Sequence, residues 1–272
     1  MKVIIHDEVF ANDNFDELTL ISIIEFGYQG RHSILTSPTL NQNFEPQEGT
    51  NLNGWLERQS DSLTREVKFA LEAGIDGVRE SSANDEIHIT AKGTSIWDDE
   101  PLYLSLNDAQ RLLDRSLHIL VENRRNDGKF IETMIKRVLG ESFWEPLEKA
   151  FDNRWIQVEN GGGIGEMKKI VSNLIDDPVA STRTCAVFDS DAPKPDSPSN
   201  ASETLRTQCE ECRIAHHQLN RRAAENYLPR KALEASVNLL RWPNTSHPRK
   251  VVSAFSNMNR DQRHHFHMKK GF

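Results

Sequence analysis

Hydrophobic and polar positions in the first hundred residues alternate between strand-like and helix-like spacing. A strand is predicted at Lys2–Ile5, an apolar segment follows at 18–26, and residues 37–53 are polar and rich in Pro, Gly and Asn. Apolar side chains recur at helical spacing from Trp55 to Ala73. "EIHITAKG" alternates like a strand, and "SLNDAQRLLDRS" resembles a helix capped by Ser105 with Asp108 three residues later. We expect an N-terminal accessory α/β module over residues 1–105, whose role the pattern does not assign.

From residue 116 onward the pattern becomes a repeated order of strand, turn and helix. The predicted strands are "LHILVEN", "RWIQVEN" and "TCAVFDSD", and the predicted helices between them are "GKFIETMIKRVLG" and "EMKKIVSNLIDD". Strands that alternate with helices of this length indicate βαβ units with right-handed crossovers. The fold class expected is therefore α/β, with a parallel sheet flanked by helices over residues 106–272 and a helical C-terminal extension.

The extension begins after a Pro- and Ser-rich linker, "APKPDSPSNAS". A long helix is expected over 203–226, and "PRKALEASVNLLRW" predicts another before Pro243. The first would place Cys209, Cys212 and His216 on one face, which suggests a zinc site. A single helix seldom encloses a tetrahedral ion, so ordinary helix packing is the favoured interpretation.

Composition places the chain among ordinary globular proteins. Of its 272 residues, 37% are hydrophobic and 27% are charged. We expect a soluble cytoplasmic protein, because the chain has no apolar run of membrane-spanning length and its N-terminus, "MKVIIHDEVF", reaches acidic residues too early for a signal peptide. Three cysteines, an odd number, argue against a disulfide framework.

Charge is distributed unevenly along the chain. Residues 1–100 hold 19 Asp and Glu against 7 Lys and Arg, whereas the remainder holds 22 against 26. Residues 241–272 carry seven Lys and Arg and one Asp. A basic C-terminal end favours a polyanionic partner such as nucleic acid, although a solvated basic tail is an equal alternative.

Three acidic residues follow the predicted strands of the second part. Glu122 ends the first strand, and Asp189 and Asp191 end the third. Ligands gather at the carboxyl ends of parallel strands, so these carboxylates would converge if their strands are neighbours. Converging carboxylates need protons or a cation, and hard oxygen ligands select Mg²⁺ or Mn²⁺. Asp189 and Asp191, two apart on an extended segment, would point the same way and share the ion. The competing interpretation is a solvated loop, since "APKPDSPSN" follows.

The order of these motifs resembles the TOPRIM domain of topoisomerases, bacterial primases and OLD-family nucleases. A Glu closes the first strand in "LVEN", a glycine turn follows the second in "VENGGGIG", and Asp-x-Asp closes the third in "VFDSD". The resemblance covers about residues 116–192. It implies a Mg²⁺-dependent nuclease in which Glu122, Asp189 and Asp191 are catalytic residues and metal ligands.

The resemblance also implies roles for residues around this centre. The family usually has Gly after the Glu and an acid four residues later. Here these positions are Asn123 and Asn126, which leaves Asp127 as the candidate ligand for a second metal. OLD-like members use a Lys beyond the Asp pair, for which Lys269 and Lys270 are the candidates. Phosphate or nucleic acid is expected to bind at Gly161, Gly162, Gly163 and Arg263. The segment "AAENYLPRKAL" is expected to bring Glu225 and Arg230 near the site.

Alternatives remain for the glycine turn and for the whole protein. "GGGIG" does not continue into a G-x-G-x-x-G dinucleotide-binding pattern, so a turn that reverses the chain or presents amides to a phosphate is favoured. By resemblance, the nuclease would be a toxic effector of anti-phage defence, restrained by a regulatory partner such as an ATPase or a retron-type sensor. The rival hypothesis is a non-catalytic regulatory or nucleic-acid-binding module that retains the fold.

Overall fold

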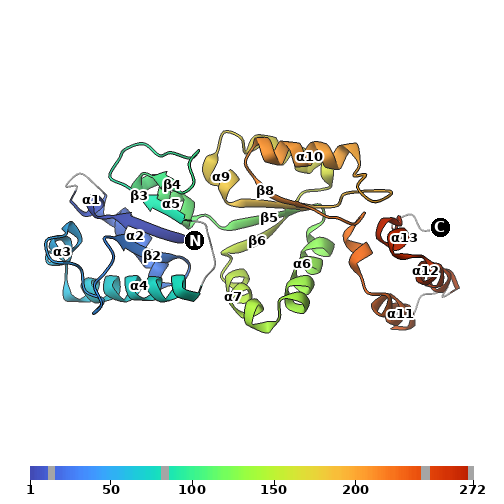
Figure 1. The fold of residues 1–272 in the computed structure, drawn as a ribbon, viewed down its shortest axis with the longest axis horizontal. Helices are drawn as coiled ribbons and strands as arrows, with labels where there is room; N and C mark the ends of the chain where they lie inside the picture. Colours follow the sequence, from blue (N-terminus) through green and yellow to red (C-terminus); the bar gives the residue numbers. More distant parts are fainter. Residues whose placement is uncertain (12–15, 81–85, 240–245, 269–272) are drawn as a thin grey trace. The chain divides into compact units, whose positions relative to one another are not determined.

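The computed structural model describes residues 1–11, 16–80, 86–239 and 246–268. The chain forms two compact units, Met1–Ser116 and Leu117–Phe272, called the N-terminal and C-terminal units below (Figure 1). Each unit contains a four-stranded sheet whose paired strands all run parallel. The α/β class with parallel sheets flanked by helices is therefore confirmed.

The N-terminal unit has the strand order β2-β1-β3-β4. Its elements are β1 (Lys2–His6), α1 (Asp7–Phe10), α2 (Glu17–Tyr28), β2 (Ser33–Ser37), α3 (Asn51–Leu56), α4 (Asp61–Glu80), β3 (Glu86–Ile89), β4 (Leu102–Leu104) and α5 (Leu106–Asp114). The helical spacing from Trp55 to Ala73 belongs to two helices, not one. The chain turns between them because the Ser60 hydroxyl accepts from the Leu63 amide and starts α4.

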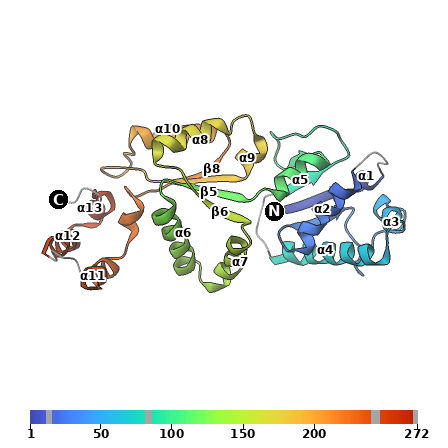
Figure 2. The same ribbon diagram turned by 180° about the vertical axis from the view of Figure 1, so that it is seen from behind.

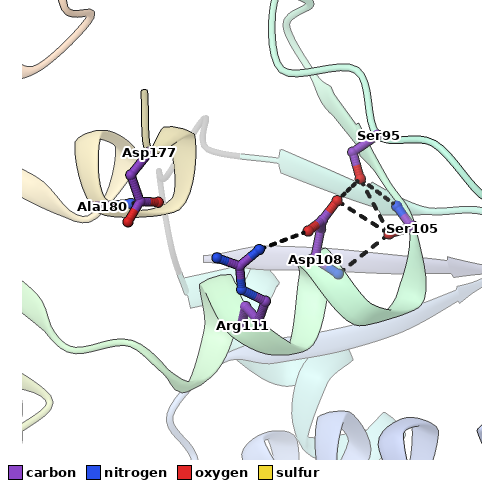
Figure 3. Close-up of polar contacts among 6 residues, drawn as sticks. All are labelled: Ser95, Ser105, Asp108, Arg111, Asp177 and Ala180. Atoms are coloured by element: carbon purple, nitrogen blue, oxygen red, sulfur yellow. Dashed lines mark hydrogen bonds and ion pairs between the residues drawn. The ribbon is translucent and has the colours of Figure 1, made fainter. Parts of the chain in front are cut away.

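Helix α5 belongs to the N-terminal unit, so the boundary lies at Ser116 and not at 105. Its apolar side chains Ala109, Leu112 and Leu113 are fully buried, and the helix contacts α2 and β4. Ser105 caps it as expected by accepting from the Asp108 amide, and the Ser95 hydroxyl donates to Asp108 Oδ2 over 2.6 Å (Figure 3). Because its apolar face is buried against α2 and β4, α5 is part of the N-terminal unit.

The C-terminal unit has the strand order β6-β5-β7-β8. Its elements are β5 (Leu117–Val121), α6 (Arg124–Val138), α7 (Glu141–Asp152), β6 (Ile156–Asn160), α8 (Ile164–Asn173), α9 (Pro178–Thr182), β7 (Thr184–Phe188), α10 (Asn200–Glu211), β8 (Ala215–Gln218), the 3₁₀ turn η1 (Ala224–Tyr227), α11 (Arg230–Leu239), α12 (Ser246–Asn257) and α13 (Arg260–His265). Asp177 caps α9 by accepting from the Ala180 amide (Figure 3).

Helices cover both faces of this second sheet. Helices α8 and α10 lie on one face, and α6 and α7 lie on the other (Figures 1 and 2). The main core lies under α8 and α10 and consists of Leu120, Ile164, Met167, Val171, Ala186, Phe188, Leu205, Cys209, Cys212 and Ile214. This core includes Leu120 of β5 and both Ala186 and Phe188 of β7, so it holds in place the strand ends that precede Glu122 and Asp189.

The prediction of one helix over 203–226 is wrong. Helix α10 ends at Glu211, the chain reverses at Arg213 with φ of 53°, and β8 pairs with β7. The Cys209–Cys212–His216 face therefore does not exist, because His216 lies on β8 and its ring stacks beside Phe188. The two cysteines are core residues, in agreement with the packing interpretation.

We expect the buried thiols to be unreactive in the native protein. Burial raises the pKa values of Cys185, Cys209 and Cys212, and that of Cys209 reaches about 12. Only the thiolate is nucleophilic, so labelling of Cys209 by Ellman's reagent at pH 8 should be roughly 10³-fold slower than that of a free thiol. All three cysteines should react in urea, and rapid labelling of native Cys209 would contradict this packing.

Within the described residues, no helix is both long enough and apolar enough to cross a membrane.

Candidate active site

Strands β5 and β7 are neighbours, as the convergence of Glu122 with the Asp pair requires. Val121 is in register with Val187, so Glu122 and Asp189 follow the two strand ends side by side. The Asp189 backbone amide donates to Glu122 Oε1 over 3.0 Å. The Glu122 carboxylate therefore lies across the end of β7, next to the first residue of the Asp-x-Asp motif.

Asp189 is held on several sides. It is 6% exposed, and its Oδ1 accepts from the Ala224 amide of η1 over 3.0 Å. Its backbone carbonyl accepts from the hydroxyl of Ser202, a fully buried residue of α10, over 2.7 Å. The carboxylate is thus fixed by segments that come later in the chain, an arrangement that limits its freedom to reorient.

Asp191 does not continue the strand. β7 ends at Phe188, and Asp191 has φ of 50°, which is the left-handed region. The Asp191 amide donates to the Arg222 carbonyl, and the Ser190 hydroxyl donates to the Arg221 carbonyl. The expectation that extended backbone aligns Asp189 with Asp191 is therefore wrong, because the chain turns between them to join residues 221 and 222.

The residues that could hold a divalent ion are Glu122 and Asp189, with Asp191 close by in the chain. The described residues contain no group of three or more His, Cys, Asp and Glu side chains placed to hold a metal. Mg²⁺ commonly binds through one or two carboxylates and keeps several waters. A carboxylate that accepts a hydrogen bond can still coordinate a cation through its remaining lone pairs. The Glu122–Asp189 pair therefore fits such an ion in donor chemistry.

Asp127 has a structural contact that the sequence did not suggest. It lies in the first turn of α6, and its Oδ2 accepts from the Asn123 amide over 2.8 Å. The Asn123 side chain in turn accepts from the amides of Arg125 and Asn126. Together these contacts cap the start of α6 and fix the backbone that follows Glu122.

The glycine turn joins β6 to the end of β5. The Gly161 amide donates to the Val121 carbonyl, and the Gly163 amide donates to the Glu122 carbonyl. A Cβ atom on Gly161 would lie 2.3 Å from Met167 Cγ and 2.9 Å from the Val121 oxygen, so only glycine fits. The prediction that these amides bind phosphate is not supported at Gly161 and Gly163, because both donate within the fold. Gly162, with φ of 69°, completes the reversal.

The C-terminal helix α13 is attached to η1 through Asn226 and to the loop after β7 through His265. The Asn226 side chain is 2% exposed, accepts from the Ala223 amide, and donates to the carbonyls of Arg263 and Phe266. Buried His265 donates from Nδ1 to the Ala192 carbonyl over 3.1 Å. The histidine-rich segment, as far as Met268, is therefore packed against residues 189–192, called the carboxylate loop below, and is not a loose tail. Lys269 and Lys270 lie outside the described residues.

Basic residues flank the carboxylates. Arg124 and Arg125 are exposed at the start of α6, directly after Asn123, and Arg263 is half-buried on α13. Arg221 has a structural role as well, since its guanidinium stacks on Tyr227 and donates to the Asn226 carbonyl. Arg230, expected near the site, pairs with Glu234 within α11. Exposed arginines beside clustered carboxylates are suited to a phosphate-bearing ligand.

His264 adds no full charge to this basic region. Burial, together with the nearby charges of Arg221 and Arg260, lowers its pKa. The neutral imidazole is therefore the main form at neutral pH.

Ser202, Asn226 and His265 were missed by sequence reasoning. Each is polar and buried, and each bonds to a residue of the carboxylate loop or of the segments that hold it. Their partners are between 13 and 73 positions away in the chain, so no local spacing could reveal them.

Comparison of the chain with protein-family models, with curated proteins and with solved structures gave no match in any of the three. The chemistry of the strand-end carboxylates is therefore inferred from their own geometry.

Proposed function

We propose that the C-terminal unit is a Mg²⁺- or Mn²⁺-dependent phosphodiesterase that cleaves DNA or RNA. The single observation that carries the proposal is the Glu122–Asp189 contact, which brings acids 67 positions apart to the ends of neighbouring parallel strands. Two carboxylates that share one strand-end region would repel each other unless a proton or a cation compensates them. The arginines at the start of α6 supply the opposite charge that a phosphate backbone needs.

Each of the site residues would have a distinct role. Glu122 and Asp189 would hold the ion, and Asp189 is kept in place by the Ala224 amide and the Ser202 hydroxyl. Arg124 and Arg125 would contact the substrate phosphates, and Asp191 would offer a further carboxylate from the loop. The bound ion would supply Lewis-acid stabilisation of the phosphodiester oxygens and a more acidic water.

The wider role is part of the same proposal. The resemblance to TOPRIM nucleases supports a toxic effector of anti-phage defence, kept inactive in the cytoplasm by a regulatory protein. The N-terminal unit is acidic, unlike the basic C-terminal region that would bind nucleic acid. We therefore assign the contact with the regulator to the N-terminal unit.

A second candidate function is favoured by one observation. Both carboxylates accept backbone amides, Glu122 from Asp189 and Asp189 from Ala224, which are also the contacts expected of acids with a purely structural role. On that hypothesis the unit binds nucleic acid through its arginines without cleaving it.

The test uses the full chain with supercoiled plasmid, single-stranded DNA and single-stranded RNA, in Mg²⁺, Mn²⁺ or EDTA. Cleavage should require the ion and should fall about 10²-fold or more in Asp191→Asn. Asn tolerates the left-handed backbone of this position, so the fold should be retained. The matched control is Asp196→Asn, an exposed residue of the same loop that also has positive φ, and it should cleave like the wild type.

A second measurement covers the case in which the isolated protein is inactive. Calorimetry with Mn²⁺ should show binding that is lost in Asp189→Asn and kept in Asp196→Asn. Absence of both cleavage and ion binding, with salt-dependent nucleic-acid binding retained, would replace the proposal with the non-catalytic function.

A further inference from the structure

The N-terminal unit carries a polar cluster on one face of its sheet. Alternate residues of the strands lie on opposite faces, and one set is buried: Val3, Ile5, Ile34, Ile87, Ile89 and Leu104. The other face carries half-buried Lys2 and His6 from β1 and Glu86 and His88 from β3. Ionisable groups therefore gather where a parallel sheet is usually covered by apolar side chains.

These four side chains form a continuous chain of contacts. Lys2 Nζ lies 2.6 Å from Glu86 Oε2, and His88 Nε2 lies 2.7 Å from Glu86 Oε1. His6 Nε2 and His88 Nδ1 are 2.7 Å apart. The ring of Tyr103 stacks on His88, with centroids 4.9 Å apart, and limits its rotation.

The hydrogen-bond chemistry fixes the proton on His88. Glu86 accepts from Lys2 Nζ through Oε2, and a carboxylate paired with an ammonium group only accepts hydrogen bonds. His88 Nε2 must then be the donor, which leaves Nδ1 with a lone pair in the neutral ring. That lone pair points at His6 Nε2, and the two nitrogens share a single proton.

Two imidazole nitrogens that converge on one point are also the start of a metal site. Zn²⁺ binds His nitrogens at about 2.0–2.1 Å, which places two tetrahedral ligands roughly 3.3 Å apart. The His6 and His88 nitrogens, now 2.7 Å apart, would have to separate by about 0.6 Å and turn their lone pairs toward the ion. A ligating His almost always donates its other ring N–H to a carboxylate or carbonyl, and Glu86 accepts that bond from His88.

We propose that His6 and His88 form a two-histidine site for a late first-row transition metal such as Zn²⁺, in which Glu86 orients His88 and water completes the coordination. The ion takes the place between the two nitrogens and links β1 to β3, while the proton of His6 moves from Nε2 to Nδ1, so that the ring stays neutral. The negative charge of residues 1–100, with 19 acids against 7 Lys and Arg, favours the approach of a cation. Imidazole ligands select Zn²⁺, Ni²⁺ or Cu²⁺, whereas the strand-end carboxylates of the C-terminal unit suit Mg²⁺ or Mn²⁺.

The test is calorimetric titration of the full chain with ZnCl₂ and NiCl₂. His6→Gln and His88→Gln should each bind one ion fewer than the wild type. Glu86→Gln should keep the site with affinity about 10- to 100-fold lower, because it removes only the charge that orients His88. His217→Gln is the matched control, since His217 is an exposed strand histidine on β8, and it should leave this site unchanged.

A stability measurement gives an independent result. An ion that binds only the folded unit should raise the melting temperature of the wild type with increasing Zn²⁺ concentration, but not that of His6→Gln. Circular dichroism establishes that each variant is folded, and His6, at the end of β1, is the less disruptive of the two positions. Folded His6→Gln that binds as many ions as the wild type, with equal affinity, would overturn the proposal.

Discussion

Replacing Glu122 with glutamine is expected to reduce divalent-ion-dependent cleavage by about 10³-fold while leaving the fold intact. Glutamine keeps an oxygen that can accept from the Asp189 amide, so the contact between the ends of β5 and β7 persists. Only the negative charge disappears, and with it a proposed ligand of the ion. Stabilisation by a bound cation amounts to several kcal/mol, and each 1.36 kcal/mol corresponds to a factor of ten in rate.

Glu122→Ala provides the comparison that separates chemistry from structure. It removes both the charge and the acceptor, so cleavage should be lost as in Glu122→Gln. The Asp189 amide also loses its partner, which should cost about 1–3 kcal/mol in the free energy of unfolding. Urea denaturation and a plasmid cleavage assay on both variants measure the two effects. If Glu122→Gln cleaves as fast as the wild type, Glu122 is a structural acid.

Substitution of Gly74 by alanine is expected to destabilise the N-terminal unit by about 3 kcal/mol or more. Gly74 lies in α4, where a Cβ atom would be 2.0 Å from the Ile34 carbonyl oxygen and 2.9 Å from its carbon and nitrogen. These are backbone atoms of β2, whose register with β1 prevents them from moving alone. Helix α4 would have to move off the sheet as a whole.

Gly54→Ala is the matched control in the same unit. Gly54 lies in α3, and the nearest atom to an added Cβ is the end of the Arg58 side chain at 4.0 Å. Alanine should therefore stabilise the helix by about 0.5–1 kcal/mol, the ordinary difference in helix propensity. Hydrogen exchange of β1 and β2 peptides in increasing urea measures both variants. Equal stability of the two would show that α4 does not pack as closely as described.

Local patterns were sufficient where an element is defined by its own side chains. The strands β1, β5, β6 and β7 and the helix α5 lie where the apolar spacing predicts them. In β1, β7 and α5 the reason is visible in the burial, because each buries its periodic positions on one side. The Ser105 cap was also predicted, since it involves residues only three apart.

The same patterns failed where distant contacts decide the structure. β8 reads "AHHQ", with no apolar alternation, and forms because β7 offers a free edge after the chain reverses at Arg213. The turn at Asp191 likewise depends on the Arg222 carbonyl, 31 residues later. Neither partner can be identified from neighbouring residues in the sequence.

The sequence by itself determined the class of the fold, because alternating strands and helices must bury their apolar faces in a parallel sheet. It also determined which acids end up at strand ends, since Glu122 and Asp189 directly follow apolar runs. Only the tertiary structure decided that β5 and β7 are neighbours, that His265 holds α13 to the carboxylate loop, and that His6 meets His88. These pairings are long-range, and their energy comes from burial and hydrogen bonds formed only when the whole unit is folded.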